Sequence, residues 1–299
     1  MPDFKKHLQT NQVTTVSKEL ITNMVEKALE EDFFSGDITS SVVSDDKIVL
    51  AKIFSNQKMV LCGCEWVNEV FFQFDSCIEI YWLKKDGDQI NVKEIICKIL
   101  GRAKSILACE RVALNFLQTL SSVSTETRKY VDLVSGYSNV KILDTRKTIP
   151  GYRIAQKYAV FCGGGINHRL GLFDGILIKE NHLLSSDYSI QEIIKKFRIN
   201  FPNNLIEIEV ENFNELRQAI FAKADLIMLD NFSIENIRKA VKFVDKLSPN
   251  NERRPQLEVS GGASLESVKR VIKTGVDYVS VGSLTKNISA VDLTMRFFL

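Results

Sequence analysis

The 299-residue chain has little net charge, no long apolar run and no secretion signal at its start. Its net charge is only +2, so no overall field directs it to nucleic acid or to a membrane surface. No apolar run reaches the roughly 20 residues of a membrane-spanning helix. The polar start, residues 1–12, lacks the apolar core of a secretion signal. We therefore expect a cytoplasmic globular protein that binds neither nucleic acid nor membrane.

The six cysteines show no paired CxxC spacing and no adjacent histidine, which argues against a zinc site built on them. They lie mostly in apolar surroundings, so we expect reduced, structural thiols. With 45% hydrophobic residues, the chain can bury a large core in one large or two moderate domains.

The first part of the chain predicts helices around an antiparallel sheet. Residues 17–31 place apolar side chains at helical spacing and predict an amphipathic helix. Extended apolar runs follow at 47–54, 58–62, 78–83 and 95–100. Asp86-Gly87 is a plausible tight turn between two of these runs. Residues 104–120 carry a broad apolar stripe, interrupted by Arg111, and predict a buried helix. A linker is expected at 120–125, which is rich in helix-capping residues.

The second part alternates short apolar runs with helical stretches, which predicts a parallel sheet in an α/β fold. The six runs lie at 140–143, 175–179, 206–210, 225–229, 257–260 and 278–282. Each ends in polar or glycine residues, and in an α/β barrel these ends share the face that carries the active site. Six strands, or seven if one is missed, predict an incomplete barrel.

Cations gather after the first of these strands. Arg146 and Lys147 follow it directly, and a turn at Pro150-Gly151 leads to a helix that carries Arg153. Arginine suits a planar carboxylate, whereas lysine supplies a compact, movable charge. We expect an anion site, with a solvated basic helix start as the alternative.

A triple glycine, residues 163–165, precedes Asn167-His168-Arg169. Glycine lets the backbone bring its amides close to a ligand, although a plain flexible loop is an alternative. The chain has only three histidines, and two fall between residues 141 and 182, among basic residues. We therefore expect His168 and Arg169 to take part in binding.

Three charged residues end the next three strands. Lys179 ends the second strand of the sheet. It could contact an anion or act as a Schiff-base nucleophile; the structural alternative is a lysine side chain that extends from the strand end to solvent. Glu209 and Asp230 end the third and fourth strands and can hold Mg²⁺, directly or through water, or stabilise a developing cation. Helix capping and local ion pairing are the other interpretation of these carboxylates.

Glycine loops end the last two strands, at Ser260-Gly261-Gly262 and Gly282-Ser283. Such loops are typical of the phosphate site of α/β barrels, with simple structural turns as the alternative. Together these residues predict a ligand with a phosphate at one end, acidic groups at the other and a metal between them.

These residues lie in segments that resemble the quinolinate phosphoribosyltransferase family. The resemblance covers most of the chain in order, and residues 143–182 are its most specific part. The similar segments are 31–40, 109–125, 143–182, 206–216, 227–233, 257–268 and 274–285.

The resemblance implies an N-terminal open α/β sandwich domain, residues 1–119, and an incomplete α/β barrel, residues 120–287. It also implies that the tail, residues 288–299, returns to the first domain. The family transfers the phosphoribosyl group of PRPP to quinolinate and releases pyrophosphate and CO₂, which yields nicotinate mononucleotide for NAD synthesis. No organic cofactor is implied.

The resemblance also assigns residues. It implies quinolinate and PRPP contacts for Arg146, Lys147, Arg153, His168, Arg169 and Lys179, with Lys147, Lys179, Glu209 and Asp230 as catalytic groups. Glu209 and Asp230 would serve Mg²⁺, and the two late glycine loops would hold phosphate. Arg111 would reach the site of a neighbouring subunit in a homodimer or higher oligomer. Many relatives have histidine where this chain has Lys286, which leaves a proton-transfer role there in doubt.

Three other functions remain open. Paralogues linked to molybdenum transport share the architecture. A barrel aldolase would use Lys179 as a Schiff base, and a phosphate-ligand sensor would bind PRPP or a nucleotide without turnover.

Overall fold

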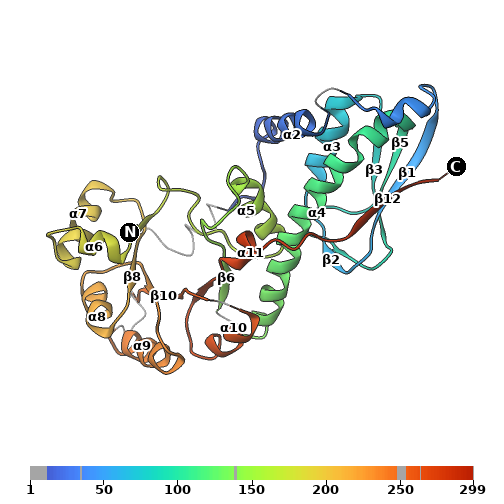
Figure 1. Ribbon diagram of the computed structural model, residues 1–299. Coiled ribbons are helices and arrows are strands. Elements are labelled where there is room, and N and C mark those ends of the chain that lie inside the picture. Colours follow the sequence, from blue (N-terminus) through green and yellow to red (C-terminus); the bar gives the residue numbers. More distant parts are fainter. Residues whose placement is uncertain (1–11, 34–35, 138–139, 248–253, 263, 299) are drawn as a thin grey trace. The chain divides into compact units, whose positions relative to one another are not determined.

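The computed structural model describes residues 12–33, 36–137, 140–247, 254–262 and 264–298 (Figure 1). These residues form two compact units, each built from segments distant in sequence. The antiparallel unit comprises Val13–Arg128, Ile154–Gly164 and Asn287–Leu299. The barrel unit comprises Gln12, Lys129–Arg153 and Gly165–Lys286. Residues 1–11 lie outside the described residues.

The antiparallel unit contains a four-stranded sheet in the order β12-β1-β5-β3 and a two-stranded sheet β2-β4. Its strands are β1 Ile48–Ser55, β2 Met59–Val60, β3 Glu79–Trp82, β4 Gln89–Ile90, β5 Ile95–Arg102 and β12 Leu293–Phe298. Its helices are α2 Lys18–Phe33, η1 Thr39–Val42, α3 Cys64–Phe74, most of α4 Ala103–Val134 and most of α5 Arg153–Cys162. The antiparallel sheet and the helix expected at 17–31 are confirmed.

Two features of this unit depart from the sequence-based expectation. The linker expected at 120–125 is wrong, because these residues lie inside α4, Ala103–Val134. Their serine and threonine hydroxyls bond to backbone instead; Ser124 Oγ, for example, donates to the carbonyl of Val60 at 2.7 Å. Helix α3, Cys64–Phe74, was not predicted.

The barrel unit contains six parallel strands in the order β6-β11-β10-β9-β8-β7. The strands are β6 Lys141–Leu143, β7 Ile176–Ile178, β8 Ile206–Val210, β9 Leu226–Leu229, β10 Gln256–Val259 and β11 Tyr278–Ser280. Among the described residues, β6 and β7 form the two edges, so the barrel is incomplete. The predicted α/β class and all six predicted strands are confirmed.

Helices follow the strands and cover the outer side of this sheet (Figure 1). They are α6 Glu180–Leu184, α7 Ile190–Asn200, α8 Phe213–Phe221, α9 Ile234–Leu247, α10 Leu265–Val271 and α11 Ser283–Lys286. In α9, the buried residues Ile237, Ala240, Val241 and Val244 recur at helical spacing. Because every strand runs in the same direction, the loops that follow the strands lie at one end of the sheet.

Among the described residues, no helix combines the length and the apolar character needed to cross a membrane.

Candidate active site

Asp144, directly after β6, ties two loops of the barrel unit together. Its fully buried carboxylate accepts a hydrogen bond from Asn167 Nδ2 and another from the backbone N–H of His168, both at 2.8 Å. The backbone N–H of Asp144 donates to the carbonyl of Ile166 at 3.1 Å. The loop that follows the triple glycine is thereby held beside the loop that carries Arg146.

Lys147 lies against the loop after β11. A Cβ atom added at Gly282 would lie 3.1 Å from Lys147 Cδ, so the lysine side chain would have to shift slightly to accommodate any other residue there. The carbonyl of Lys147 accepts a hydrogen bond from Thr285 Oγ1 at 2.8 Å. Its backbone N–H donates to Thr145 Oγ1 at 3.1 Å. The Lys147 side chain itself remains exposed.

The guanidinium groups of Arg146 and Arg169 come from separate loops and repel one another. Burial and the charge of Arg146 lower the pKa of Arg169 below its usual value, while Glu207 and Asp174 act in the opposite sense. Arg169 Nη1 donates to the carbonyl of Gly175 at 3.3 Å. In the described structure, the buried Nε of Arg146 has no hydrogen-bond partner. Two neighbouring cations with an unused donor can bind an anion, above all a carboxylate.

The His168 imidazole contacts two buried carboxylates. Its Nε2 lies 2.8 Å from Glu207 Oε2 and 3.5 Å from Glu258 Oε2. Burial lowers the pKa of His168, but the two carboxylates raise it more, to well above its usual value. Nδ1 accepts the backbone N–H of Arg169 at 2.8 Å, which requires an unprotonated Nδ1. The carboxylates and the Arg169 amide therefore act in opposite senses on protonation of the ring.

Lys179 and Asp230 directly follow strands β7 and β9, and Glu209 is the penultimate residue of β8, the strand between them. Lys179 Nζ lies 3.4 Å from Glu209 Oε2. Burial raises the pKa of Glu209 and Lys179 lowers it, but the charge of Asp230 raises it further, and the net shift is upward. These three side chains thus form one electrostatic group, as expected for residues that end adjacent parallel strands.

The loop after β10 adjoins this group. Gly261 and Gly262 have φ of 97° and 56°, a region that favours glycine. A Cβ atom at Gly261 would lie 3.3 Å from Asp230 Oδ1. After β11, the buried Ser283 Oγ has no hydrogen-bond partner among the described residues. The predicted phosphate loops therefore lie beside Asp230 and Lys147 respectively.

Glu209 and Asp230 fit Mg²⁺. Magnesium is usually bound by one or two carboxylates, with waters and substrate phosphates completing its oxygen ligands. Glu209 Oε2 is buried and accepts no hydrogen bond within the described ranges, although Lys179 is paired with it. Glu209 and Asp230 could therefore hold such an ion next to the glycine loop after β10.

Several other predicted residues have local roles. Arg153 donates from Nε to Thr148 Oγ1 at 3.1 Å and from Nη1 to the carbonyl of Leu170 at 3.3 Å, which braces two loops of the site. His182 Nδ1 accepts the backbone N–H of Lys179 at 2.9 Å at the start of α6. Arg111 is exposed on α4, in the antiparallel unit. Substrate contacts of Arg153 and Arg111 stay predictions.

Sequence reasoning missed the roles of Asp144, Glu207 and Glu258. Glu207 and Glu258 occupy positions in strands where their neighbours Ile206, Ile208 and Leu257 are fully buried. A carboxylate is rarely buried at such a position unless a partner stabilises it. A glutamate inside an apolar run therefore indicates a buried carboxylate with a partner, but the sequence could not identify that partner as His168.

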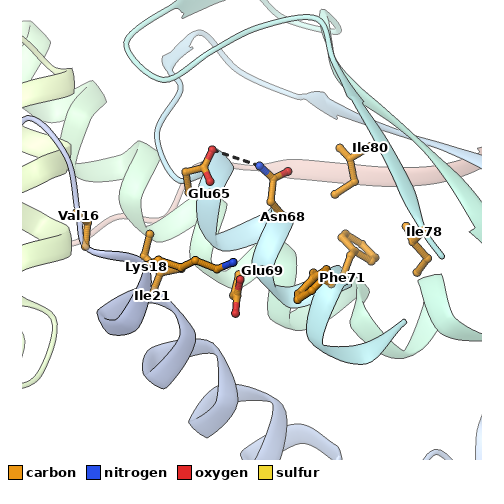
Figure 2. Close-up of a pocket in the computed structure, with 10 residues that line it drawn as sticks. Val16, Lys18, Ile21, Glu65, Asn68, Glu69, Phe71, Ile78 and Ile80 are labelled. Atoms are coloured by element: carbon orange, nitrogen blue, oxygen red, sulfur yellow. Dashed lines mark hydrogen bonds between the residues drawn. The ribbon is translucent and has the colours of Figure 1, made fainter. Parts of the chain in front are cut away.

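The antiparallel unit has a separate cavity of about 450 Å³ with different chemistry (Figure 2). Its lining includes one lysine, Lys18, and two glutamates, Glu65 and Glu69, together with apolar side chains. Glu65 accepts a hydrogen bond from Asn68 Nδ2 at 3.3 Å, and Glu69 accepts one from Thr22 Oγ1 at 2.7 Å. This lining does not favour an anionic ligand.

Comparison with known proteins matches most of the chain to one family. The family model "Quinolinate phosphoribosyl transferase, N-terminal domain" matches residues 37–121, and the corresponding C-terminal domain matches residues 123–296. The chain is 40% identical over 266 residues to a probable nicotinate-nucleotide pyrophosphorylase (carboxylating) of Bacillus subtilis, with 89% of each chain covered. It is 35% identical over 281 residues to the one of Methanocaldococcus jannaschii, with 93% of this chain and 97% of the relative covered.

The fold agrees with these matches. The solved structure of the nicotinate-nucleotide pyrophosphorylase from Francisella tularensis superposes with a TM-score of 0.91 at 44% identity. The alignment covers 96% of this chain and 99% of the other. The chain belongs to the quinolinate phosphoribosyltransferase family.

Proposed function

We propose that the protein transfers the phosphoribosyl group of PRPP to the ring nitrogen of quinolinate. Pyrophosphate and CO₂ leave, and nicotinate mononucleotide is formed for NAD synthesis. Membership of the family supports this reaction, as does a barrel unit whose strand ends carry cations, carboxylates and glycine loops.

The pair Arg146 and Arg169 is the observation that carries the proposal. Burial and the charge of Arg146 lower the pKa of Arg169, and the buried Nε of Arg146 has no hydrogen-bond partner in the described structure. A dicarboxylate such as quinolinate would relieve the repulsion between the two guanidinium groups and would accept hydrogen bonds from both of them. Lys179, which follows β7, would add a third cation.

The remaining residues suit the phosphoribosyl donor. Pyrophosphate leaves the ribose as the ring nitrogen attacks, so positive charge develops on the sugar while negative charge develops on the leaving group. Lys147, held against Gly282, would stabilise the leaving anion, and the glycine loops would bind phosphate through their amides. Glu209 and Asp230 would face the developing positive charge on the sugar. Holding both reactants in place lowers the entropic part of the barrier.

Loss of CO₂ follows from the charge of the product ring. Once its nitrogen carries the ribose, the ring is cationic, and the bonding electrons of the departing 2-carboxylate can remain on the ring carbon. That carbon then takes up a proton. Arg146 and Arg169 would keep the carboxylates oriented during this step.

Mg²⁺ is the proposed cofactor, held by Glu209 and Asp230. When bound, it would neutralise charge on the pyrophosphate group. Chelation with EDTA should abolish turnover, and added Mg²⁺ should restore it. Glu209→Gln should raise the Mg²⁺ concentration needed for half-maximal rate by roughly tenfold or more. An enzyme that keeps full activity in EDTA would contradict the proposal.

The test of the reaction is direct. The protein is incubated with quinolinate, PRPP and Mg²⁺, and nicotinate mononucleotide and CO₂ are measured, with nicotinate in place of quinolinate as the control substrate. We expect product with quinolinate and none when nicotinate replaces it. Binding of PRPP without turnover would indicate a sensor, and borohydride trapping of Lys179 with a carbonyl substrate would indicate an aldolase.

We also propose a homodimer or higher oligomer in which Arg111 completes the site of a neighbouring subunit. The exposure of Arg111 on α4 is compatible with this role. Arg111→Ala and Lys147→Ala proteins, each inactive alone, should regain activity when their subunits are mixed. No recovery after verified subunit exchange would contradict the shared site. Six free cysteines support a reducing, cytoplasmic location.

A further inference from the structure

The contacts of His168 form a chain from the sheet of the barrel unit to Arg169. Glu207 on β8 and Glu258 on β10 approach Nε2 of the ring, at 2.8 Å and 3.5 Å. On the other side of the ring, Nδ1 accepts the backbone N–H of Arg169 at 2.8 Å. The His168 side chain is 11% exposed, so solvent competes little for these contacts.

This arrangement costs folding free energy. Glu258 is fully buried, and within the described residues both of its carboxylate oxygens lack a hydrogen-bond partner. Glu207 Oε1 is buried in the same condition. Burial of carboxylates with incomplete pairing is unfavourable, and apolar side chains of similar volume would usually be no less stable there. A stability role therefore does not explain the two glutamates, and a role in the site does.

We infer that Glu207 and Glu258 are positioning residues that act through His168 on Arg169. The carboxylates fix the orientation of the imidazole, and the imidazole fixes the Arg169 amide. Asp144 holds the same loop through the His168 amide at 2.8 Å. The loop that carries Arg169 is thereby held in place, although the charge of Arg146 acts unfavourably on the Arg169 guanidinium. The inference rests on the proposed function, in which these two arginines bind quinolinate.

The effect should fall on one substrate. Without the carboxylates, the imidazole can rotate and the Arg169 loop can relax away from Arg146. Quinolinate binding then weakens, whereas the PRPP contacts of Lys147 and the glycine loops stay in place. Glu258→Gln keeps the volume of the side chain and removes its charge. We expect it to raise KM for quinolinate by roughly tenfold, with KM for PRPP within about twofold of wild type.

The matched variants separate positioning from general damage. Glu207→Gln keeps an acceptor for Nε2 and should have a smaller effect than Glu207→Leu, which removes it. Glu69→Gln, a buried glutamate of the antiparallel unit, serves as the control and should leave both KM values unchanged. A merely structural role would reduce the active fraction, and so kcat, without changing KM for quinolinate selectively.

A second readout does not depend on turnover. The protein has three histidines, His7, His168 and His182, so their ring signals can be distinguished by NMR. In Glu258→Gln, the His168 signals should shift and titrate at lower pH, while those of His182 stay unchanged. Unchanged His168 signals would overturn the inference.

The outcomes are distinguishable. If the wild-type protein makes no nicotinate mononucleotide, the proposed function fails, and the NMR result still tests the contacts of His168. If the wild type turns over but Glu258→Gln matches it both in KM for quinolinate and in the NMR signals of His168, positioning fails and the function stands. His168, Glu207 and Glu258 also place their ligand atoms within 4.8 Å of one another. One equivalent of tightly bound metal, lost in Glu258→Gln, would assign a metal site there instead.

Discussion

Both units contain carboxylates that are at least partly shielded from solvent, but they treat them differently. In the antiparallel unit, Asp86 accepts the backbone N–H groups of Gly63 and Cys64 at 3.0 and 3.1 Å and the hydroxyl of Tyr158 at 2.9 Å. In the barrel unit, Glu258 and Glu209 retain buried oxygens without a hydrogen bond from the described residues. Asp86 helps to hold the fold, as Asp144 does in the barrel unit, whereas Glu258 and Glu209 keep acceptor oxygens without a hydrogen bond.

The difference shows where folding and function compete. A buried carboxylate that accepts hydrogen bonds at its oxygens stabilises local structure. One that lacks these hydrogen bonds destabilises the fold and is kept only where it serves function. Such groups in the barrel unit gather at and below the ends of β8 and β10, next to the cations of the candidate site. Among the described residues, buried carboxylate oxygens without a hydrogen bond occur only in the barrel unit, and they therefore indicate the site independently of any family resemblance.

The largest expected effect is on stability in the antiparallel unit. Asp86→Ala leaves two amides at the start of α3 and the Tyr158 hydroxyl without their acceptor, and should lower the free energy of unfolding by about 2–4 kcal/mol. Urea denaturation measures this. Enzyme that remains folded should keep its KM values, and a selective change in KM for one substrate would contradict a structural role.

The next effect is on activity in the barrel unit. Lys147→Ala and Arg169→Ala should each lower kcat/KM by about 2 kcal/mol or more, because each removes a charge-assisted contact to substrate. The midpoint of thermal unfolding should change little. Lys195→Ala, an exposed lysine on α7, is the control. Near-wild-type turnover in both variants would remove these residues from the site.

A smaller effect tests the comparison most directly. Glu258→Gln should leave the free energy of unfolding unchanged or raise it by up to about 1 kcal/mol, because it removes a buried charge that lacks hydrogen bonds. Quinolinate turnover should nevertheless fall. Urea denaturation of the variant beside the wild type measures the change. A loss of stability comparable to that of Asp86→Ala would mean that Glu258 stabilises the fold as Asp86 does.

The smallest effect concerns acid stability. Asp75 accepts hydrogen bonds from Arg102 and Ser105, and Arg102 holds its pKa below the usual value although burial acts the other way. A lowered pKa stabilises the fold above the unfolded value of about 4, and this stabilisation is lost as pH falls through the folded value. Asp75→Asn should be less stable than wild type at about pH 6, and the difference should shrink toward pH 2. Unfolding curves measured at several pH values test this. A difference in the free energy of unfolding that does not change with pH would contradict it.

Much of the site could be predicted because parallel strands order it. Lys179, Glu209 and Asp230 each end a strand that its apolar run reveals, and adjacent parallel strands bring their ends together. The contacts of Lys147 with Gly282 and Thr285 could not be predicted, because they depend on β6 and β11 becoming neighbours across more than 130 residues of sequence. The linker at 120–125 was wrong because capping residues also occur inside a helix when their hydroxyls bond to backbone.

The sequence by itself determined the class of fold, the family and the residues at the strand ends, because periodicity and local motifs are properties of neighbouring residues. Only the tertiary structure decided which charges meet. His168 Nε2 lies close to both Glu207 and Glu258, and the charge of Arg146 acts on Arg169, because strands and loops distant in the chain pack together. The electrostatic interaction between two side chains depends on their separation in space and on burial, which sequence order does not fix.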